Sequence, residues 1–249
     1  MKLTSQQENQ EHDYSFPYHY LDLKLEDQRL NAIEYLHYLQ KIKEKIQPFY
    51  GQKILDIGCG DGRFIYELKH EFVTLVGLDY SEQAIRFARA FNPEILFYTL
   101  PLENLPTKET FDVIVLMEIL EHIPQKDIPH FLKHVRKHLK KDGKIILSVP
   151  SIHMEQPKKH YQHFTAESIQ ATLDTSFTVL DIQGHGKIGF KRTLFYALRL
   201  LVQIFYPLQN TFSLIRSFIP SLQNFYKKHL EKADVHHSLR FIIVAEPKY

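Results

Sequence analysis

The sequence predicts an α/β fold in which a mostly parallel sheet carries helices on both faces. Short apolar runs alternate with amphipathic stretches between residues 50 and 150, which is typical of parallel strands joined by crossover helices. The first run leads into three glycines at alternate positions, Gly58, Gly60 and Gly62, and a helical pattern follows. Acidic residues, Asp56 and Asp79, end two of the runs. Ligands of such sheets bind at the carboxyl ends of the strands.

The expected elements follow one another along the chain. Residues 1–13 are polar, 14–20 are aromatic, and 25–49 have the apolar spacing of a helix. Strands are expected at 53–58, 73–79, 94–98, 111–117, 143–149, 177–183 and 239–245. Helices are expected at 62–70, 81–91, 126–140 and 166–174. Ser81 is the expected cap of the second of these, and Thr165 with Ser168 the expected cap of the last. Asp142-Gly143 is expected to precede the fifth strand.

The composition indicates a globular protein in a reducing compartment. The chain has 249 residues, of which 44% are apolar and 24% charged, enough for one large domain or a domain with a subdomain. A lone cysteine, Cys59, excludes disulfides within the chain. No apolar run reaches the ~18 residues of a membrane span, and the polar start of the chain does not look like a secretory signal. We therefore expect a cytoplasmic location.

The glycine turn and the two acids predict an adenosyl ligand. A turn without Cβ atoms lets a ligand approach the backbone closely, and the spacing D-x-G-x-G-x-G differs from the G-x-G-x-x-G of dinucleotide binders. Asp79 follows Asp56 by 23 residues (79 − 56) and ends the next apolar run. A carboxylate there can accept both ribose hydroxyl protons. The alternatives are an ordinary tight turn and a helix-capping Asp79.

Several segments resemble the class I S-adenosylmethionine (SAM) methyltransferases. Residues 56–62 resemble their first motif, and Glu118 to His122 reads Glu-Ile-Leu-Glu-His, similar to the Glu-x-x-Glu-His segment of ubiquinone-type O-methyltransferases. Residues 160–168 resemble the His-x-x-x-Phe-Thr pattern of the same group. The resemblance implies a Rossmann-like, seven-stranded methyltransferase sheet, SAM as cofactor, and these binding residues: Asp56, Gly58, Cys59, Gly60, Gly62, Asp79, Tyr80, Leu102, Glu103, Met117, His122 and Tyr20. Residues 102–106 resemble the loop that lies beside the adenine ring in this family. Pro101 stands before this loop where the family usually has Asp, so the resemblance implies only backbone contacts to the adenine amino group.

A hydroxyl acceptor would need a base that is active near neutral pH, which favours histidine. The candidates near the carboxyl edge of the sheet are His122, His153, His160 and His163. No Cys partner or helical H-x-x-x-H spacing accompanies them, so we expect no metal. The aromatic segment 14–20 is expected to close over the site, with Tyr18, His19 or Tyr20 against the cofactor or acceptor.

Residues 187–236 are not explained by the resemblance. Basic residues between 187 and 232 are Lys187, Lys191, Arg192, Arg199, Arg216, Lys227, Lys228 and Lys232, and Glu231 is the single acid. The segment thus carries +8 − 1 = +7, and the rest of the chain +2 − 7 = −5. Pro207 and Pro220 are expected to divide it into about three short helices.

Three interpretations of this insertion stay open. It is an extra helical layer, or a surface that lies on anionic lipid and admits an apolar acceptor, or a dimer or nucleic-acid interface. Nucleic acid is the weakest partner, because the basic residues are interleaved with aliphatic ones. A homo-oligomer stays open.

The sequence therefore predicts a SAM-dependent methyltransferase that acts on oxygen of a small-molecule or lipid-like acceptor. The expected division is an N-terminal segment with a cap helix (1–49), a SAM-binding domain (50–186 plus 237–249) and a basic, aromatic-rich helical insertion (187–236). The alternatives are an RNA or protein methyltransferase and a non-catalytic SAM-binding regulator.

Overall fold

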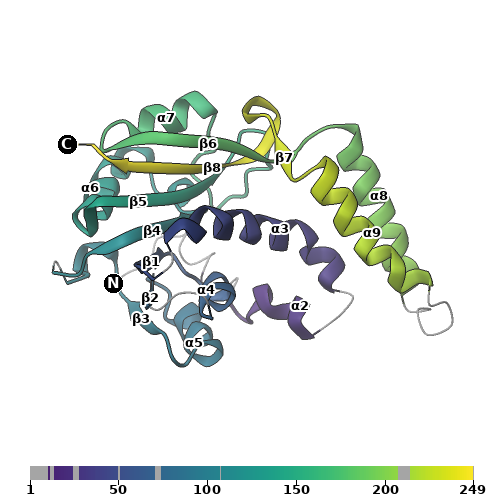
Figure 1. The fold of residues 1–249 in the computed structure, drawn as a ribbon, viewed down its shortest axis with the longest axis horizontal. Helices are drawn as coiled ribbons and strands as arrows, with labels where there is room; N and C mark the ends of the chain where they lie inside the picture. Colours follow the sequence, from purple (N-terminus) through teal and green to yellow (C-terminus); the bar gives the residue numbers. More distant parts are fainter. Residues whose placement is uncertain are drawn as a thin grey trace.

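One sheet of eight strands organises the protein (Figure 1). The computed structural model describes residues 11, 14–24, 28–49, 51–70, 74–106, 108–206 and 214–248. The strands are β1 (Lys53–Ile57), β2 (Thr74–Asp79), β3 (Leu96–Thr99), β4 (Phe111–Met117), β5 (Leu139–Pro150), β6 (Phe177–Lys187), β7 (Lys232–Ala233) and β8 (Ser238–Pro247). Their order is β3-β2-β1-β4-β5-β8-β6-β7. The first five are parallel, and β8, β6 and β7 pair antiparallel.

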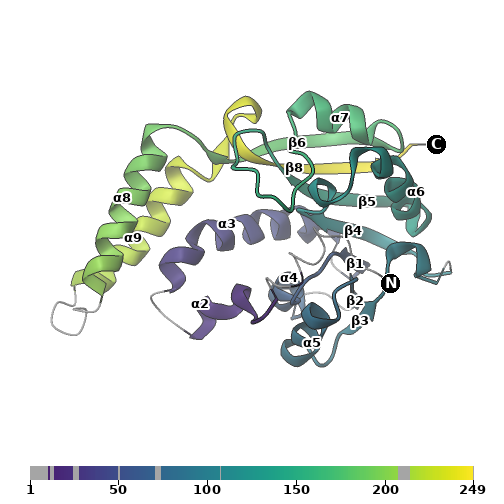
Figure 2. The same cartoon turned by 180° about the vertical axis from the view of Figure 1, so that it is seen from behind.

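Helices cover both faces of this sheet (Figures 1 and 2). The α-helices are α2 (Leu21–Lys24), α3 (Gln28–Ile46), α4 (Arg63–Leu68), α5 (Glu82–Phe91), α6 (Ile128–Lys137), α7 (Ala166–Leu173), α8 (Phe190–Phe205) and α9 (Leu214–His229). Short 3-10 turns are η1 (Tyr18–Tyr20), η2 (Gln47–Phe49), η3 (Leu102–Asn104), η4 (Leu120–His122), η5 (Gln125–Asp127) and η7 (Val235–His237). The α/β class expected from the sequence is confirmed.

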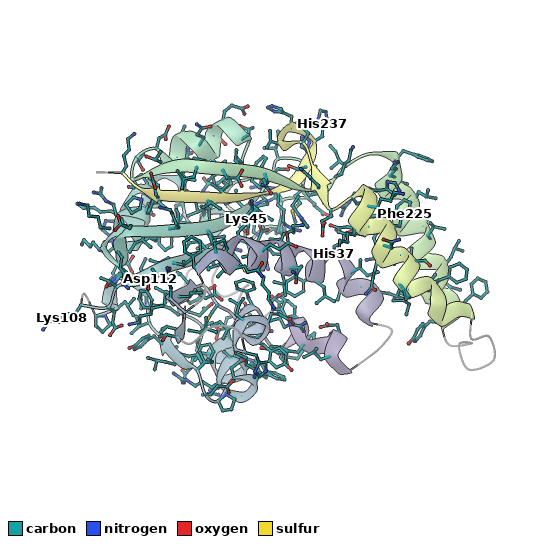
Figure 3. The ribbon with its side chains drawn as sticks, in the orientation of Figure 1. His37, Lys45, Lys108, Asp112, Phe225 and His237 are labelled. Carbon is teal, nitrogen blue, oxygen red and sulfur yellow. The ribbon has the colours of Figure 1, made fainter. Side chains whose placement is uncertain are left out.

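The alternation of side chains along β4 explains the two layers. Val113 and Val115 are buried against α3, α4 and α5, whereas Ile114 and Leu116 are buried against α6 and α7. Successive residues of a strand point to opposite faces, so a continuous apolar run requires cover on both sides. Polar contacts add to the cover: Lys45 of α3 binds Asp181 of β6 at 2.7 Å (Figure 3).

The insertion forms a helical hairpin that projects from the body of the protein (Figures 1 and 2). Its inner side packs on the first half of α3, in a cluster formed by Leu30, Ile33, Phe195, Tyr206, Leu222, Tyr226 and Leu230. Two polar contacts join the same elements: Arg192 binds Glu34 at 2.6 Å, and His37 lies 2.9 Å from Glu231. The hairpin is thus attached along α3, and its far end points away from the sheet.

The structure differs from three sequence expectations. The sheet has eight strands rather than seven, because the two-residue β7 pairs with β6, and two residues are too few to show a periodic pattern. β5 begins at Leu139, not at 143, because Leu139 pairs with Phe111 and a bulge accommodates Gly143. In the described part of the insertion there are two helices, since α9 continues through the exposed Pro220. The division into three units stays a prediction.

Candidate active site

Two adjoining cavities lie at the carboxyl ends of β1, β2 and β4. The first, of about 210 Å³, is named the tyrosine cavity and is lined by Tyr14, Tyr18, His19, Tyr35, Tyr38, Asp56, Gly58, Cys59, Gly60, Asp61, Arg63, Phe64, Met117, Glu118, Ile119, Glu121, His122, Lys159 and His160. The second, of about 260 Å³, is named the Asp79 cavity and is lined by Ile57, Gly58, Leu78, Asp79, Tyr80, Leu100, Pro101, Leu102, Glu103, Ile119, His122, Ile123 and Phe131. They share Gly58, Ile119 and His122, so together they form one elongated site.

The turn after β1 requires glycine at two positions. Gly58 and Gly60 have φ of +71° and +53°, which side chains rarely adopt. A Cβ on Gly58 would lie 2.1 Å from Cδ1 of Ile119, and one on Gly60 would lie 2.3 Å from the hydroxyl of Tyr14. The turn therefore brings bare backbone to the wall of both cavities, as the motif predicts.

Asp79 is held at the end of β2 with both oxygens engaged by backbone. Its Oδ2 accepts the amide of Gly60 and its Oδ1 the amide of Ser81, each at 2.9 Å. Burial raises the pKa of Asp79 to about 6, and these two amides only partly oppose that rise. Ser81 caps α5, since its Oγ accepts the amide of Ala84. The alternative role of Asp79 as the cap is thereby wrong.

Asp56 and Asp61 present unsatisfied acceptors to the tyrosine cavity. Oδ1 of Asp56 and Oδ2 of Asp61 are buried and have no hydrogen-bond partner among the described residues. Burial, with a smaller contribution from Asp79, raises the pKa of Asp56 to about 8. A buried acceptor without a partner costs about 1–3 kcal/mol, so a ligand that donates hydrogen bonds here would relieve that cost.

Three of the four candidate histidines come together. His122 lies between the cavities, and its Nδ1 lies 3.3 Å from the carbonyl of Lys159. The ring of His160 meets that of His122 at a centroid distance of 4.6 Å, and Nδ1 of His160 lies 2.8 Å from Nε2 of His163. Burial, followed by His122, lowers the pKa of His160 to about 3, so this ring is neutral near pH 7. His153 lies elsewhere, against the carbonyl of His236.

Glu121 is a buried acid beside these rings. It is fully buried, and neither of its carboxylate oxygens has a partner among the described residues. Burial, then Glu118, raises its pKa well above the usual range. Ligand atoms of Glu121, His122 and His160 lie within 4.8 Å of one another, as do those of Glu103, His130 and His134 on the surface. Either group has donors suited to a cation. The expectation that the site uses no metal stays a prediction.

The N-terminal segment covers the tyrosine cavity and is fastened to the glycine turn. Nδ1 of His19 lies 3.0 Å from Oδ1 of Asp61. The buried guanidinium of Arg63 donates to both oxygens of Asp22, at 2.7 and 3.2 Å, and to the carbonyl of His19 at 3.0 Å. Tyr20 instead stacks on Phe91 with centroids 3.8 Å apart and lines neither cavity.

Most of the expected binding residues line one of the two cavities. Gly62 and Tyr20 of the expected binding residues lie outside both, as do His153 and His163 of the candidate bases. Sequence reasoning missed Tyr35, Tyr38, Glu121, Arg63 and Lys159. Tyr35 and Tyr38 lie on α3 three residues apart, a spacing that the sequence could show only as one side of a helix. No described residue of the insertion lines either cavity, so the expectation that it covers the acceptor cavity gains no support.

The order and direction of the strands are those of a class I SAM-dependent methyltransferase. Among solved structures, the magnesium protoporphyrin IX methyltransferase from Synechocystis with bound SAM has a TM-score of 0.60 and 16% identity over 99% of both chains. A SAM-dependent methyltransferase from Archaeoglobus fulgidus has a TM-score of 0.54 and 16% identity, over 84% of this chain and 94% of that one.

Sequence comparison places the chain in a family. A model described as a methyltransferase domain matches residues 26–181, and the chain belongs to that family. The ubiquinone biosynthesis O-methyltransferase of Idiomarina loihiensis is 32% identical over 113 residues, 43% of this chain and 46% of that protein. That of Pelagibacter ubique is 36% identical over 107 residues, 41% and 44% of the two chains. The chain thus spans about half the length of the curated relatives it matches.

Proposed function

We propose that the protein transfers a methyl group from SAM to an oxygen atom of a small, lipid-like acceptor. The observation that carries this proposal is the pair of cavities joined at Gly58, Ile119 and His122. One holds a strand-end carboxylate suited to ribose, and the other holds tyrosines and histidines. The similarity to ubiquinone biosynthesis O-methyltransferases supports oxygen as the methylated atom and a lipid-like acceptor.

The residues present fit SAM on several counts. Asp79 can accept hydrogen bonds from the ribose hydroxyls, and Leu102 and Glu103 line the same cavity where the adenine ring would lie. The unsatisfied oxygens of Asp56 and Asp61 suit the donors of the methionine ammonium group. Tyrosine faces near a sulfonium would stabilise its positive charge.

The acceptor would bind in the tyrosine cavity, beside the methyl group. SAM supplies a methyl group bonded to a sulfonium sulfur, and the neutral thioether that departs is a good leaving group. The protein therefore mainly orients the acceptor. Tyr18, Tyr35 and Tyr38 form an aromatic wall there. His160 or His122 would accept the hydroxyl proton, because both rings line this cavity.

The experiment is a paired binding and turnover measurement. Calorimetry should show that SAM and S-adenosylhomocysteine bind, and phenols carrying aliphatic tails should yield S-adenosylhomocysteine when incubated with SAM and the protein. Binding without turnover on any phenol would favour a non-catalytic regulator. Turnover only with RNA, weakened by salt, would favour a nucleic-acid methyltransferase. Absence of SAM binding would refute the proposal.

We further propose that the α8–α9 hairpin attaches the protein to anionic membranes. Large apolar side chains are exposed on it, among them Phe190 at 81%, Ile204 at 60%, Leu200 at 56% and Phe218 at 53%. Three exposed lysines lie at the end of the hairpin near the sheet: Lys191, Lys227 and Lys228. In the part of the chain that the structure describes, no helix is long and apolar enough to cross a bilayer. This pattern favours attachment to one leaflet.

Flotation with liposomes tests this attachment. The double variant Lys227→Glu and Lys228→Glu should abolish binding to anionic vesicles, since each basic residue near such a surface contributes roughly 1 kcal/mol. Arg192 is unsuitable for this test because it binds Glu34 and so also holds the hairpin on α3. Equal binding to neutral and anionic vesicles would contradict the electrostatic part of the proposal, and no binding at all would refute it.

A further inference from the structure

A groove between the two hairpin helices lies far from the candidate active site in the fold. It measures about 540 Å³ and is lined by Leu198, Leu201, Val202, Phe205, Phe218, Ser221, Leu222 and Phe225. Ser221 is the one polar residue among these described lining residues. The volume falls within the range of roughly 300–1,000 Å³ that is usual for small-ligand sites. A ligand that fits must be hydrocarbon where it meets these walls.

The groove stays open to solvent although its walls are apolar. Leu201, Phe205 and Phe218 are 51%, 50% and 53% exposed. By contrast, Phe195 and Tyr226, one or two turns nearer the sheet, are fully buried against α3. Figure 3 places Phe225 on the same hairpin, where its ring stacks on that of Phe195 at 6.4 Å. The apolar end of the hairpin is therefore the part that the rest of the chain does not cover.

Most of the positive charge of the hairpin lies away from this groove. Among the described side chains Arg199 is the exception, and its guanidinium lies over the ring of Tyr196 at 4.8 Å, one turn nearer the sheet. We define the basic collar as Lys187, Lys191, Lys227, Lys228 and Lys232, all exposed and all at the end where the hairpin meets the sheet. None of the described residues that line the groove is charged. From Lys191 to Leu201 is ten residues of helix, or about 15 Å at ~1.5 Å per residue. Half of a bilayer hydrocarbon core is also about 15 Å thick.

We propose that this groove binds one acyl chain of an anionic membrane phospholipid. The basic collar would lie at the level of the lipid phosphate, and the groove about 15 Å deeper, within the hydrocarbon of one leaflet. The positive charge and the distance therefore fit the headgroup and the acyl chain of a single lipid. The inference rests on the proposed membrane attachment and adds to it a defined site with a stoichiometry. A membrane surface alone would contact the whole exposed apolar face of α8. A groove that binds one acyl chain would contact that chain only through its lining residues.

The chain offers a matched control on the same helix. Leu200 and Ile204 are as exposed as Leu201 and Phe205, at 56% and 60%, but they do not line the groove. Replacing either pair by glutamine removes similar apolar surface, and because all four are half exposed the variants should fold. Circular dichroism and a melting curve verify folding before binding is compared.

The readout uses the fact that the protein contains no tryptophan. In the Phe218→Trp variant the single indole lies in the groove wall, and in the Ile204→Trp variant it lies outside. The probe is a lysophosphatidylglycerol with a brominated acyl chain, kept below its micelle concentration so that no membrane is present. We expect saturable quenching to less than half in the first variant, at one probe per chain, and less than a tenth as much quenching in the second.

The glutamine pairs then locate the effect. Leu201→Gln with Phe205→Gln should abolish quenching in the Phe218→Trp background, and Leu200→Gln with Ile204→Gln should leave it within twofold. Equal quenching at both tryptophan positions, or none at Phe218→Trp, would overturn the proposal. So would a dimer that dissociates with the first glutamine pair in light scattering, because the groove would then be an interface between two copies.

Vesicle flotation separates this inference from the proposed attachment. If quenching persists in a protein that does not bind anionic vesicles, the membrane attachment is refuted. The groove would then be a binding site for free lipid. Flotation without specific quenching would keep the attachment and refute the groove. Neither outcome alters SAM binding, because no described groove residue lines the two cavities of the candidate active site.

Discussion

The carboxyl edge of the sheet and the far end of the α8–α9 hairpin are opposites in construction. At the edge, polar atoms are buried in fixed positions, and backbone amides, strand ends and a glycine turn hold Asp79 and Gly60 in place. At the hairpin end, apolar atoms are left exposed and few polar contacts constrain them. The first region is ordered for a ligand with defined donors and acceptors. The second suits a ligand, or a surface, without them.

The difference shows which part of a function a fold determines. The cofactor half of the site follows from backbone geometry shared by methyltransferase folds, so it can be tested by single substitutions with sharp effects. The hairpin is an addition at the sheet edge, and its effects should be distributed over several side chains.

The largest effect is expected at the acceptor end of the edge. His160→Gln should lower kcat by about 10²- to 10⁴-fold, the usual contribution of a general base. SAM affinity should change little, because the ring of His160 contacts His122 and His163 and not the carboxylates proposed to bind SAM. Steady-state kinetics and calorimetry measure the two quantities. His153→Gln, remote from both cavities, is the control, and an unaffected kcat in His160→Gln would move the role to His122.

The next effect compares burial in the two regions. Ile114 is fully buried within β4, so Ile114→Ala should lower the free energy of unfolding by about 2–5 kcal/mol. Ile204 is 60% exposed on the hairpin, so Ile204→Ala should change it by no more than about 0.5 kcal/mol. Urea denaturation of the two variants gives the comparison. Similar losses would show that the hairpin end is buried in solution, for example by a second copy.

The same contrast explains what the sequence could predict. The alternation of apolar runs and amphipathic helices predicted the sheet, and the motif around Gly58 and Asp79 predicted the edge where the two cavities lie, because both signals are local in sequence. Ser81 and Thr165 were predicted as helix caps for the same reason, and both are confirmed. Such signals depend on a few adjacent residues.

What the sequence did not reveal depends on contacts between distant segments. Tyr35 and Tyr38 reach the cavity only because α3 packs on β5, where Tyr38 contacts Ser148, and Arg63 is buried only because Asp22 lies against it. Pro220 was expected to break a helix, yet its ring is exposed and α9 continues. β7 exists only through its pairing with β6. None of these is encoded in a local pattern.

A smaller effect is expected from the ribose carboxylate. Asp79→Ala should weaken SAM binding by about 1–3 kcal/mol, the contribution of charge-assisted hydrogen bonds. Asp112→Ala is the control, because Asp112 lies at the opposite end of the strands and binds Lys140 at 2.7 Å (Figure 3). Calorimetric titration with SAM measures both. Equal weakening in the two variants would point to a general loss of folding instead of a lost ribose contact.

The titration of Asp79 predicts how SAM binding depends on pH. Its pKa is raised to about 6, and the ionised form is the one that accepts the ribose hydroxyls. Affinity should therefore be constant above pH 6 with respect to this group and fall about tenfold per unit below it. Asp56, with a pKa of about 8, would give a separate break at higher pH. In Asp79→Asn the lower break should vanish, and its persistence would assign it to another group.

The smallest effect is expected where the N-terminal segment meets the glycine turn. His19→Ala removes the contact with Asp61 at 3.0 Å and a part of the cavity wall. One such hydrogen bond contributes about 0.5–1.5 kcal/mol, so SAM affinity should fall by roughly two- to tenfold. Leu23→Ala, on the exposed side of the adjacent α2, removes a side chain of similar size that is 42% exposed and lines neither cavity. It should leave affinity unchanged. If both variants bind SAM as the unaltered protein does, the segment packs beside the site without closing it, and the acceptor half of the cavity is open to solvent during binding.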